Sequence, residues 1–467
     1  MKVIIRVDAA YGDGLGHLMR CLVLTEYWRS LGANCQFFTK NPSDQAIIFL
    51  KDYDWYDVAL DGDYSWRNIE ADIFLVDSYH LLVGRDDVAS FLVLLDDWPH
   101  REIDADILID QNPIRTTEEY KNFVSKRTRM LLGNNYLLLR KEFYNQRFSY
   151  VGLAHKKLNV LIYLGGSDSS GYTFEIAKML FSDFSQYLGE VTALVSRSSP
   201  SWDRLKSLPV KRVEFCDCMA NLYRQFDVCF GAAGSSAWER ATSGLASAIY
   251  VMAENQKDVA AYCENSGIAM VAGDLTRGPL HNRRKISGFL TDASYRSSIV
   301  EEGAKLLKNR AELEVTKRIL VSDSSSISLE EFVMADAPYL YRMQCEPGLR
   351  KFFKNKRIPT WRGHYNWLLK YIANDRCSGY IIKLYGIKVG YVRVDSGMED
   401  EISIAISKRY LGLGLGKLAI KIVQSEYKGN AVSKALVAVV AKGNMASRRL
   451  FLACGFRKVS GDKYVWK

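Results

Sequence analysis

A short apolar strand that runs through glycines into a helix recurs along this chain and most constrains its fold. The first copy is RVDAAYGDGLGHLMRCLVL at residues 6–24, and later copies lie in KKLNVLIYLGGSDSSGYTFEIAKML and FDVCFGAAGSSAWERATSGLASAIYV. Glycines leave the backbone accessible, and the first N–H groups of a helix lack partners, so such turns attract anions. The pattern therefore predicts sites of phosphate size between strands and helices.

The first glycine turn is followed directly by a histidine. His17 stands at the start of the next helix, and a neutral imidazole accepts protons near pH 7. We therefore expect an active-site loop that handles a phosphorylated ligand, with His17 as its reactive group. A tight turn with an incidental histidine explains this stretch, taken alone, equally well.

Composition limits the class of protein. The 467 residues suggest about three domains, and the formal charge of +10 favours anionic partners such as nucleotides, phosphates or coenzyme A. Basic residues are spread along the chain, so we expect no nucleic-acid partner. The start MKVIIRVD becomes charged too early for a secretory signal, and no apolar run is long enough for a membrane span. We expect a cytoplasmic enzyme with no membrane partner.

The nine cysteines give no sign of a metal site. Cys216 and Cys218 are one residue apart, with no second pair or histidine at zinc-site spacing. Most of the others lie in apolar segments such as DVCFGAAG. We interpret them as reduced core thiols and expect no metal.

Residues 1–148 alternate apolar strands such as IFLVDS and FLVLLDD with helical stretches. This alternation predicts an α/β domain with a parallel sheet covered by helices on both faces. Asp8, Asp77, Asp97 and Asn112 fall at strand ends, where ligands of such sheets gather. Each is also explained as an ordinary cap of a helix or turn, so both interpretations stay open.

Residues 149–315 repeat this architecture. Gly165 and Gly166 occupy a turn between strand and helix, and the small residues 231–236 lead into a helix whose first turn carries Glu239. Asn255 and Gln256 open another helix. Two such doubly wound, Rossmann-like domains would place their loops across a cleft from one another.

The pattern changes after a predicted linker at residues 316–326. Residues 327–467 contain successive strands with short turns, such as GYIIKLYGIKVGYVRVD and EISIAIS, followed by a glycine loop, a helix and further strands. We expect a mixed-sheet α+β domain.

The first 310 or so residues resemble the UDP-2,4-diacetamido-2,4,6-trideoxy-β-L-altropyranose hydrolases of pseudaminic acid biosynthesis. The resemblance rests on ordered pieces: RVDAAYGDGLGHLMR, FLVDSY, LLDDWPHR, LLGNNYLLLRKEF, YLGGSD, and GAAGSSAWER followed by ENQ. It implies the GT-B arrangement of two Rossmann-like domains that the family shares with glycosyltransferases. It also implies attack of water at the anomeric carbon with inversion and without a metal, which releases UDP and 2,4-diacetamido-2,4,6-trideoxy-L-altropyranose.

The same resemblance assigns site residues. His17 matches the catalytic histidine and acts as general base, and Asp8 is placed to orient the water or the sugar. Glu239 matches the carboxylate that accepts the ribose hydroxyls of UDP, although a first-turn acid also stabilises its own helix. The loop from Ala233 to Ala237 is expected to hold the diphosphate through backbone N–H groups. The expected substrate-binding set is Gly14, Gly16, Arg20, Asp77, Asn112, Gly166, Ala233, Gly234, Ser235, Ser236, Glu239, Asn255 and Gln256.

Residues 327–467 resemble the GNAT superfamily of N-acetyltransferases through GLGLGK after a strand and KGNMASRRLFLACGF further on. The resemblance implies acetyl-CoA as co-substrate, with its pyrophosphate on the glycine loop. The expected cofactor-binding residues are Leu411, Gly412, Leu413, Gly414, Leu415, Gly416, Lys417, Asn444, Ser447 and Phe451.

This domain departs from the family pattern [Q/R]xxGxG at two places. Aligning its glycines with Gly414 and Gly416 puts Leu411 at the polar position, whereas Arg409 fits only a shifted frame. Phe451 stands where many members carry a tyrosine that protonates the departing thiolate, so water or another hydroxyl serves, or the domain is catalytically weaker. Glu401 is our expected base for the attacking amine, and a surface carboxylate explains it as well.

The two resemblances together predict a bifunctional enzyme. In the family pathway the 4-amino group of a UDP-amino sugar is acetylated and UDP is then removed, so one chain would perform consecutive steps. Two alternatives stay open: a GT-B glycosyltransferase that uses a UDP-sugar, and a hydrolase joined to a non-catalytic GNAT-like binding module. The sequence leaves open the sugar stereochemistry, the order of the steps and the oligomeric state.

Overall fold

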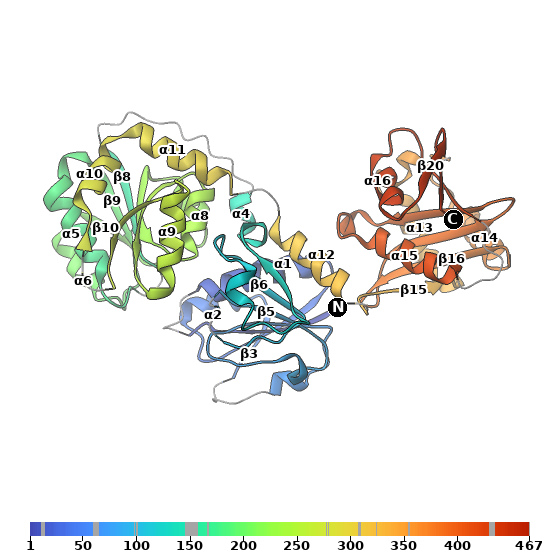
Figure 1. Ribbon diagram of the computed structural model, residues 1–467, viewed down its shortest axis with the longest axis horizontal. Helices are drawn as coiled ribbons and strands as arrows, with labels where there is room; N and C mark the ends of the chain where they lie inside the picture. The colour runs from blue at the N-terminus through green and yellow to red at the C-terminus, as the bar shows by residue number, and fades with distance from the viewer. Residues whose placement is uncertain are drawn as a thin grey trace. The chain divides into compact units, whose positions relative to one another are not determined.

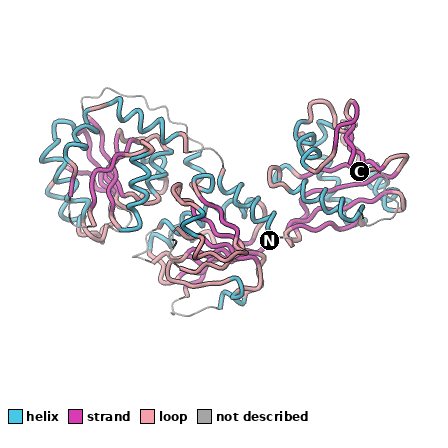
Figure 2. Tube along the Cα trace, viewed as in Figure 1, coloured by secondary structure: helices cyan, strands magenta, loops and turns pink. Residues whose placement is uncertain are grey.

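The computed structural model describes residues 1–10, 15–58, 65–97, 99, 101–144, 157–165, 168–276, 278, 280–306, 310–323, 325–353, 355–428 and 435–466. The chain divides into two compact units. The first unit comprises residues 2–29 and 34–314, and the second comprises residues 315–467 with Met1 and residues 30–33. In the described parts, the first unit holds two seven-stranded sheets and the second holds one (Figures 1 and 2).

The first sheet is parallel throughout, in the order β3-β2-β1-β4-β5-β6-β7. Its central strands are almost entirely apolar and buried, as expected of strands covered on both faces. The strands are β1 (Lys2–Val7), β2 (Asn34–Thr39), β3 (Asp54–Asp57), β4 (Ile73–Asp77), β5 (Phe91–Leu95), β6 (Ile107–Asp110) and β7 (Arg129–Leu132). The helices are α1 (Gly16–Ser30), α2 (Asp44–Leu50), α3 (Thr117–Tyr120) and α4 (Lys141–Tyr144).

The strand order reverses beside β1, which pairs with β2 on one side and with β4 on the other. Loops that follow the two central strands of such a sheet diverge and open a crevice at the carboxyl ends of the strands. The turn after β1 leads into α1, and Asp77 is the last residue of β4. The topology therefore brings the start of α1 and Asp77 to the same edge of the sheet.

The second sheet has the order β10-β9-β8-β11-β12-β13-β14 and is parallel apart from the antiparallel pair β13 and β14. Its strands are β8 (Leu158–Tyr163), β9 (Leu188–Leu194), β10 (Val210–Val213), β11 (Val228–Ala232), β12 (Ala246–Val251), β13 (Met270–Asp274) and β14 (Leu280–His281). The helices are α5 (Tyr172–Phe184), α6 (Ser201–Arg204), α7 (Met219–Tyr223), α8 (Ser236–Thr242), α9 (Lys257–Asn265), α10 (Arg283–Thr291) and α11 (Ala293–Ala304). The next helix, α12 (Ala311–Ser322), begins in the first unit and ends in the second.

Helices cover both faces of this second sheet (Figure 1). One apolar core includes side chains of α5, α10 and α11, and the other includes side chains of α7, α8 and α9. The strand order reverses between β8 and β11, so the crevice lies where Gly165 follows β8 and the 232–236 loop follows β11.

The third sheet is mixed, in the order β15-β16-β17-β18-β19-β21-β20, with β18 and β19 parallel and the other pairs antiparallel. Its strands are β15 (Ile327–Glu331), β16 (Cys377–Leu384), β17 (Ile387–Ser396), β18 (Asp400–Ile406), β19 (Leu436–Val439), β20 (Arg457–Ser460) and β21 (Lys463–Trp466). The helices are α13 (Ala337–Cys345), α14 (Trp361–Ile372), α15 (Leu415–Lys428) and α16 (Met445–Ala453).

The pairing of β18 with β19 is short. The two strands pair at Asp400 with Leu436 and at Glu401 with Val437, and these are the pairs seen between their described residues. Beyond Glu401 the rest of β18 no longer follows β19. The third sheet is therefore split along its middle.

The predicted fold class, two doubly wound sheets followed by a mixed-sheet domain, is confirmed. The predicted linker at residues 316–326 overlaps α12 (Ala311–Ser322), so its first part is helical, and the domain boundaries themselves stay predictions. No helix among the described residues has the length and apolar character needed to cross a membrane.

Candidate functional site

The first unit contains a cavity of about 370 Å³ lined by loops that follow strands of both its sheets. Most of the predicted substrate-binding residues meet there. The cavity is lined, among others, by Gly16, His17, Arg20, Asn112, Gly165, Ala233, Gly234, Ser235, Ser236, Glu239, Asn255 and Gln256. Gly14 and Gly166 lie outside the described residues.

His17 is held from behind by a carboxylate. Its Nδ1 lies 2.6 Å from Oδ1 of Asp77, which is completely buried at the end of β4. Nδ1 also lies 3.2 Å from Nη2 of Arg20, but its contact with Asp77 is much shorter, and a carboxylate only accepts. Nδ1 therefore carries the hydrogen, and in the neutral imidazole Nε2 is the nitrogen with a free lone pair. Because His17 lines the cavity, its basic nitrogen is available to a ligand there.

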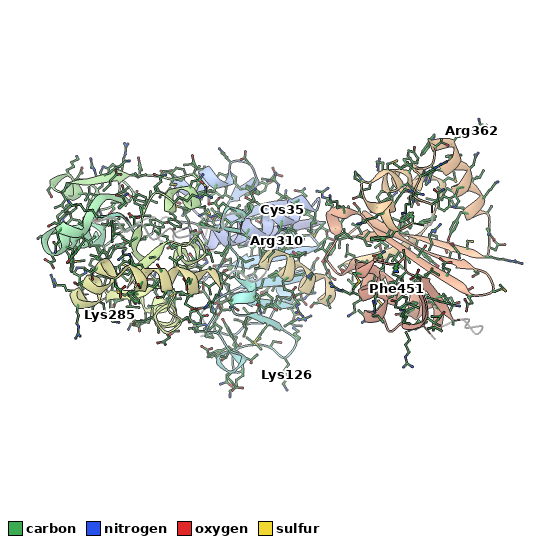
Figure 3. The ribbon with its side chains drawn as sticks, turned by 90° about the horizontal axis from the view of Figure 1, so that it is seen from above. Cys35, Lys126, Lys285, Arg310, Arg362 and Phe451 are labelled. Atoms are coloured by element: carbon green, nitrogen blue, oxygen red, sulfur yellow. The ribbon has the colours of Figure 1, made fainter. Side chains whose placement is uncertain are left out.

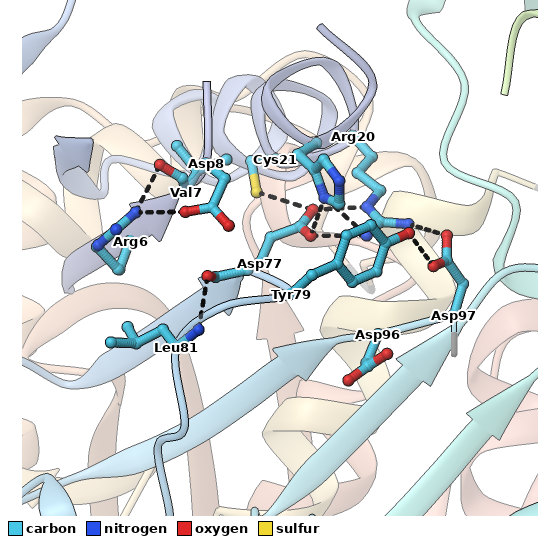
Figure 4. A network of polar contacts seen from close by, with 12 residues as sticks. Arg6, Val7, Asp8, Arg20, Cys21, Asp77, Tyr79, Leu81, Asp96 and Asp97 are labelled. Carbon is cyan, nitrogen blue, oxygen red and sulfur yellow. Dashed lines mark hydrogen bonds and ion pairs between the residues drawn. The ribbon is translucent and has the colours of Figure 1, made fainter. Parts of the chain in front are cut away.

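Arg20 binds the same carboxylate and a second one. Its Nε and Nη2 donate to the two oxygens of Asp77 at 2.5 and 2.6 Å, and its Nη1 donates to Asp97 at 2.9 Å. The hydroxyl of Tyr79 donates to the other oxygen of Asp97, and the ring of Tyr79 meets His17 edge-on at 4.6 Å. Figure 4 shows Arg20 between Asp77 and Asp97. These contacts fix the imidazole from two sides.

The network sets the charges of its members. Burial raises the pKa of Asp77, but Arg20 and His17 outweigh burial and lower this pKa to about 2. Burial lowers the pKa of His17, but Asp77 outweighs burial and leaves the pKa above its ordinary value of 6.5. Asp77 is therefore an anion throughout the neutral range, and His17 titrates at a pH somewhat higher than an exposed histidine.

Asp8 lies next to this network but is not among the described residues that line the cavity. Its Oδ1 accepts from Nη1 of Arg6 at 3.1 Å, and its Oδ2 is buried with no partner in the described structure. A buried carboxylate oxygen without a donor calls for a bound water or ligand group. That Asp8 orients the water or the sugar stays a prediction. Its Oδ2 is the atom that would accept the hydrogen bond.

The loop after β11 presents fewer backbone donors than predicted. The N–H of Ala233 donates to the carbonyl of Tyr250 at 2.8 Å, and the N–H of Ala237 donates to Gly234 at 2.9 Å. The N–H groups of residues 234–236 have no partner in the described part of the chain. Three consecutive donors, rather than five, are therefore available beside the cavity.

A buried guanidinium fixes the two ends of this loop. Arg240, which is fully buried, donates from Nη2 to the carbonyl of Ala232 at 2.7 Å and from Nη1 to Oγ of Ser236 at 2.8 Å. Its guanidinium lies so close to Gly231 that a Cβ there would stand 2.7 Å from Cζ. Only glycine fits at this position, because any side chain would displace the arginine.

Glu239 is already paired. Its Oε1 accepts from Nη2 of Arg140 at 3.1 Å, and Arg140 also lines the cavity. Gln256 has its Oε1 on the backbone N–H of Met252 at 3.0 Å, whereas Asn255 is exposed. Binding of the ribose hydroxyls by Glu239 stays a prediction. Its Oε2, the oxygen that Arg140 does not contact, would accept the hydrogen bonds of these hydroxyls.

The second unit contains a cavity of about 1080 Å³ around the split between β18 and β19. The part of β18 that has left β19 lines it through residues 402–406, and residues 439–441 line it from the other side. The predicted residues Glu401, Leu411, Asn444, Ser447 and Phe451 all line this cavity.

The predicted glycine loop precedes α15. Gly412 and Gly414 have φ of 86° and 82°, in the left-handed region that favours glycine. Leu413 and Leu415 anchor the loop because their side chains are buried. The N–H of Leu411 donates to Lys408 at 3.3 Å and that of Lys417 donates to Gly414 at 3.0 Å, so the loop's free donors lie between them.

The remaining predicted residues have local partners. Oδ1 of Asn444 caps α16 by accepting from the N–H of Ser447 at 3.1 Å. A Cβ on Gly416 would lie 3.1 Å from Leu450, so glycine lets α15 and α16 pack closely. Phe451, which is labelled in Figure 3, is buried. Its ring lies 5.0 Å from that of Phe456. No cluster of metal-ligating side chains occurs among the residues described.

Sequence reasoning missed three residues that the structure brings into the first cavity or its network. Tyr79 stands two residues after Asp77 in the quoted FLVDSY, and Arg140 lies in the quoted LLLRKEF. Arg240 immediately follows Glu239 in GSSAWER. All three residues lie inside motifs that carry the family resemblance, and this position could have identified them as candidate site residues. Nothing in the sequence indicated which residues they contact.

Comparisons with known proteins agree with this division of the chain. Residues 327–457 match the family model described as an acetyltransferase (GNAT) domain. An uncharacterised protein of Methanocaldococcus jannaschii is 24% identical over 513 aligned residues, which cover 100% of this chain and 99% of that protein.

Two further relatives are similar to part of the chain. The UDP-2,4-diacetamido-2,4,6-trideoxy-beta-L-altropyranose hydrolase of Campylobacter jejuni is 25% identical over 191 residues, 38% of this chain and 66% of that protein. The spore coat polysaccharide biosynthesis protein SpsG of Bacillus subtilis is 24% identical over 340 residues, 68% of this chain and 97% of that protein. The chain therefore joins an amino-terminal region that resembles this hydrolase and SpsG to a carboxyl-terminal acetyltransferase domain of the GNAT type.

Proposed function

We propose that the chain is a bifunctional nucleotide-sugar enzyme of the pseudaminic acid type. The first unit hydrolyses a UDP-sugar at its anomeric carbon, releasing UDP and 2,4-diacetamido-2,4,6-trideoxy-L-altropyranose. The second unit uses acetyl-CoA to acetylate the 4-amino group of the UDP-amino sugar precursor. The similarity to the Campylobacter hydrolase and the GNAT family match support this combination.

The observation that carries the hydrolytic half is the 2.6 Å contact between His17 and Asp77. It leaves Nε2 of His17 as a proton acceptor on the cavity wall. In the proposed step the water oxygen bonds to the anomeric carbon while the bond to the phosphate oxygen breaks. UDP leaves with that electron pair, and the water proton passes to Nε2.

The other groups in the cavity suit binding rather than proton transfer. In this proposal the N–H groups of residues 234–236 bind the diphosphate, and Arg240 holds the two ends of their loop. Glu239 binds the ribose, and the free oxygen of Asp8, which lies outside the cavity lining, orients the water. Because UDP is a good leaving group, positioning of the water and a base provide most of the catalysis.

The acetyltransferase half is supported by the GNAT family match. The free N–H groups of residues 412–416 suit a pyrophosphate, and Leu411 at the start of this loop lines the cavity. The cavity lies at the split between β18 and β19. Acetyl-CoA supplies the activated acetyl group. Glu401 lines the same cavity and is our proposed base for the amine.

The hydrolytic proposal is tested by His17→Gln in the purified full chain. UDP release from the UDP-sugar is expected to fall by on the order of 10²–10⁴, because the base is lost. His80→Gln is the matched control, since His80 is exposed in the same unit and does not line the cavity. If His17→Gln releases UDP at the rate of His80→Gln, His17 is not the base.

The bifunctional proposal is tested by supplying the UDP-4-amino sugar with and without acetyl-CoA and following both N-acetylated sugar and UDP. We expect acetylation that depends on acetyl-CoA, and UDP release from the acetylated product together with free sugar. Transfer of the sugar to an added acceptor instead of to water would support a glycosyltransferase. Absence of acetylation would reduce the second unit to a binding module.

A further inference from the structure

Two hydrogen-bond donors without acceptors lie close together in the acetyltransferase cavity. Tyr391 of β17 and Arg350, which follows α13, both line it, and Gln344 near the end of α13 joins them. Neither side chain was singled out by the sequence. Their contacts determine which atoms remain free.

The direction of this chain of hydrogen bonds follows from Arg350. A guanidinium only donates, so the atom of Gln344 that Nη1 of Arg350 contacts is the oxygen Oε1. Nε2 of Gln344 therefore donates to the hydroxyl oxygen of Tyr391, at 3.2 Å. Because that oxygen accepts, the hydroxyl hydrogen of Tyr391 has to be donated elsewhere, and no described residue accepts it.

Arg350 carries the second unused donor. Its Nη2 donates to the carbonyl of Asn355, and its Nε is buried with no partner in the described structure. No carboxylate in the described part of the chain forms an ion pair with it. A buried donor and an unpaired guanidinium both cost free energy unless a ligand supplies an acceptor and a negative charge.

The charged groups nearest the two donors already have partners of their own. Glu346, on the same loop as Arg350, has its Oε1 on the backbone N–H of Lys408 at 2.6 Å. Arg393, which also lines the cavity, lies 3.8 Å from a carboxylate oxygen of Asp395. Among the described residues, Arg350 is therefore a guanidinium of this lining that has no carboxylate partner.

Tyr391 remains a donor at neutral pH. Burial raises the pKa of its hydroxyl above the ordinary value, so the group keeps its hydrogen. A phenolate would repel an anion, whereas an O–H group binds one.

We propose that Arg350 and Tyr391 form an anion subsite for the diphosphate of a nucleotide-linked acceptor. This subsite lies in the acetyltransferase cavity and does not involve the glycine loop of residues 411–416. It rests on the proposed function, in which the acceptor still carries its nucleotide when it is acetylated, and it assigns two residues of this cavity to binding that nucleotide.

The test compares three acceptors with the full chain: the UDP-linked 4-amino sugar, its 1-phosphate and the nucleotide-free amino sugar. Arg350→Met is expected to raise KM for the UDP-linked acceptor about 10- to 100-fold, and Tyr391→Phe about 3- to 10-fold. KM for acetyl-CoA and for the nucleotide-free sugar is expected to stay unchanged. The 1-phosphate separates binding of one phosphate from binding of the diphosphate.

Two substitutions serve as matched controls. The hydroxyl of Tyr427 already donates to Asp400, and neither residue lines the cavity, so Tyr427→Phe removes a hydroxyl group without touching the subsite. Arg362 is exposed on α14 (Figure 3), so Arg362→Met removes a positive charge outside the cavity. Both are expected to keep the wild-type preference for the UDP-linked acceptor.

The outcomes separate the subsite from the proposed function. Equal changes of KM for all three acceptors, or none, would overturn the subsite and leave the acetyltransferase in place. A wild-type enzyme that prefers the nucleotide-free sugar would also overturn it. A wild-type enzyme that acetylates none of the three would overturn both the function and the subsite.

Discussion

The two cavities use opposite hydrogen-bonding partners to prepare a side chain. In the first unit His17 is held by Asp77, which only accepts, so the atom left for the ligand is an acceptor. In the second unit Arg350 donates to the amide oxygen of Gln344, so the amide nitrogen of Gln344 donates to Tyr391. The hydroxyl hydrogen of Tyr391 is then left for the ligand, as a donor. The polarity of the group behind a side chain thus sets the polarity of the atom in front of it.

The largest expected effect comes from changing the partner of His17. Asp77→Asn offers Nδ1 an amide that can donate, which favours the tautomer with its hydrogen on Nε2. UDP release is expected to fall by about 10²- to 10⁴-fold, the range seen when the orienting carboxylate of a histidine is replaced. Loss of the Asp77 charge is also expected to lower the pKa of His17, because burial then dominates.

Asp97→Asn is the matched control for this change. It removes the other carboxylate that binds Arg20 without removing a hydrogen bond to His17. We expect less than a tenfold loss of UDP release, measured as kcat/KM across pH. If kcat/KM falls equally in Asp77→Asn and Asp97→Asn, the role of Asp77 is to hold Arg20 and not to set the tautomer of His17.

A smaller effect is expected from reversing the partner of Tyr391. In Gln344→Glu the new carboxylate accepts from both Arg350 and Tyr391, so the hydroxyl hydrogen turns away from the cavity. KM for the UDP-linked acceptor is expected to rise about tenfold with little change in KM for acetyl-CoA.

The control for that variant is Gln424, a buried glutamine of the same unit. Gln424 donates from Nε2 to the carbonyl of Cys454 at 2.9 Å, away from the subsite. Gln424→Glu places a similar charge in the fold and is expected to leave the acceptor preference unchanged. A loss of preference in this variant as well would attribute the effect to general destabilisation.

The smallest effect concerns stability. The pKa of Asp77 is lowered to about 2, so its stabilising contribution is present above its unfolded value of about 4 and is lost as pH falls. The pKa of His17 is raised, so its contribution is present below about 6.5 and is lost as pH rises through the folded value. The free energy of unfolding lost in His17→Gln is therefore expected to be largest between about pH 4 and 6.5.

Urea unfolding measured at pH 5 and pH 8 checks this expectation, with amide hydrogen exchange in α1, the helix that carries His17, as the local probe. A loss of stability in His17→Gln that is the same at both pH values would mean that the pair with Asp77 is not an ion pair.

The sequence predicted the architecture because its signals are local. Alternation of apolar strands with helical stretches indicated the two parallel sheets, and the glycines at 412 and 414 indicated a turn before a helix. His17 was identifiable because it directly follows such a turn. Each of these signals needs only neighbouring residues.

The partners of these residues were beyond sequence reasoning because they depend on strand order. Asp77 is 60 residues from His17 and becomes its neighbour only because β4 pairs with β1. Tyr391 and Gln344 are 47 residues apart and lie on a strand and a helix. In the sequence Asp77 is one of several acidic residues at strand ends. Nothing there indicates whether its carboxylate contacts the substrate or orients His17.

The split between β18 and β19 has a consequence for how this domain tolerates mutation. Where β18 leaves its neighbour after Glu401, its described backbone groups no longer pair with β19, and residues 402–406 line the cavity. A ligand bound along such an edge is recognised by atoms that every amino acid carries except for the missing N–H of proline. Such recognition does not depend on which side chains residues 402–406 carry, although packing still constrains Ile402 and Ala405, which are buried. Substitutions that introduce proline or close the split are expected to remove the site.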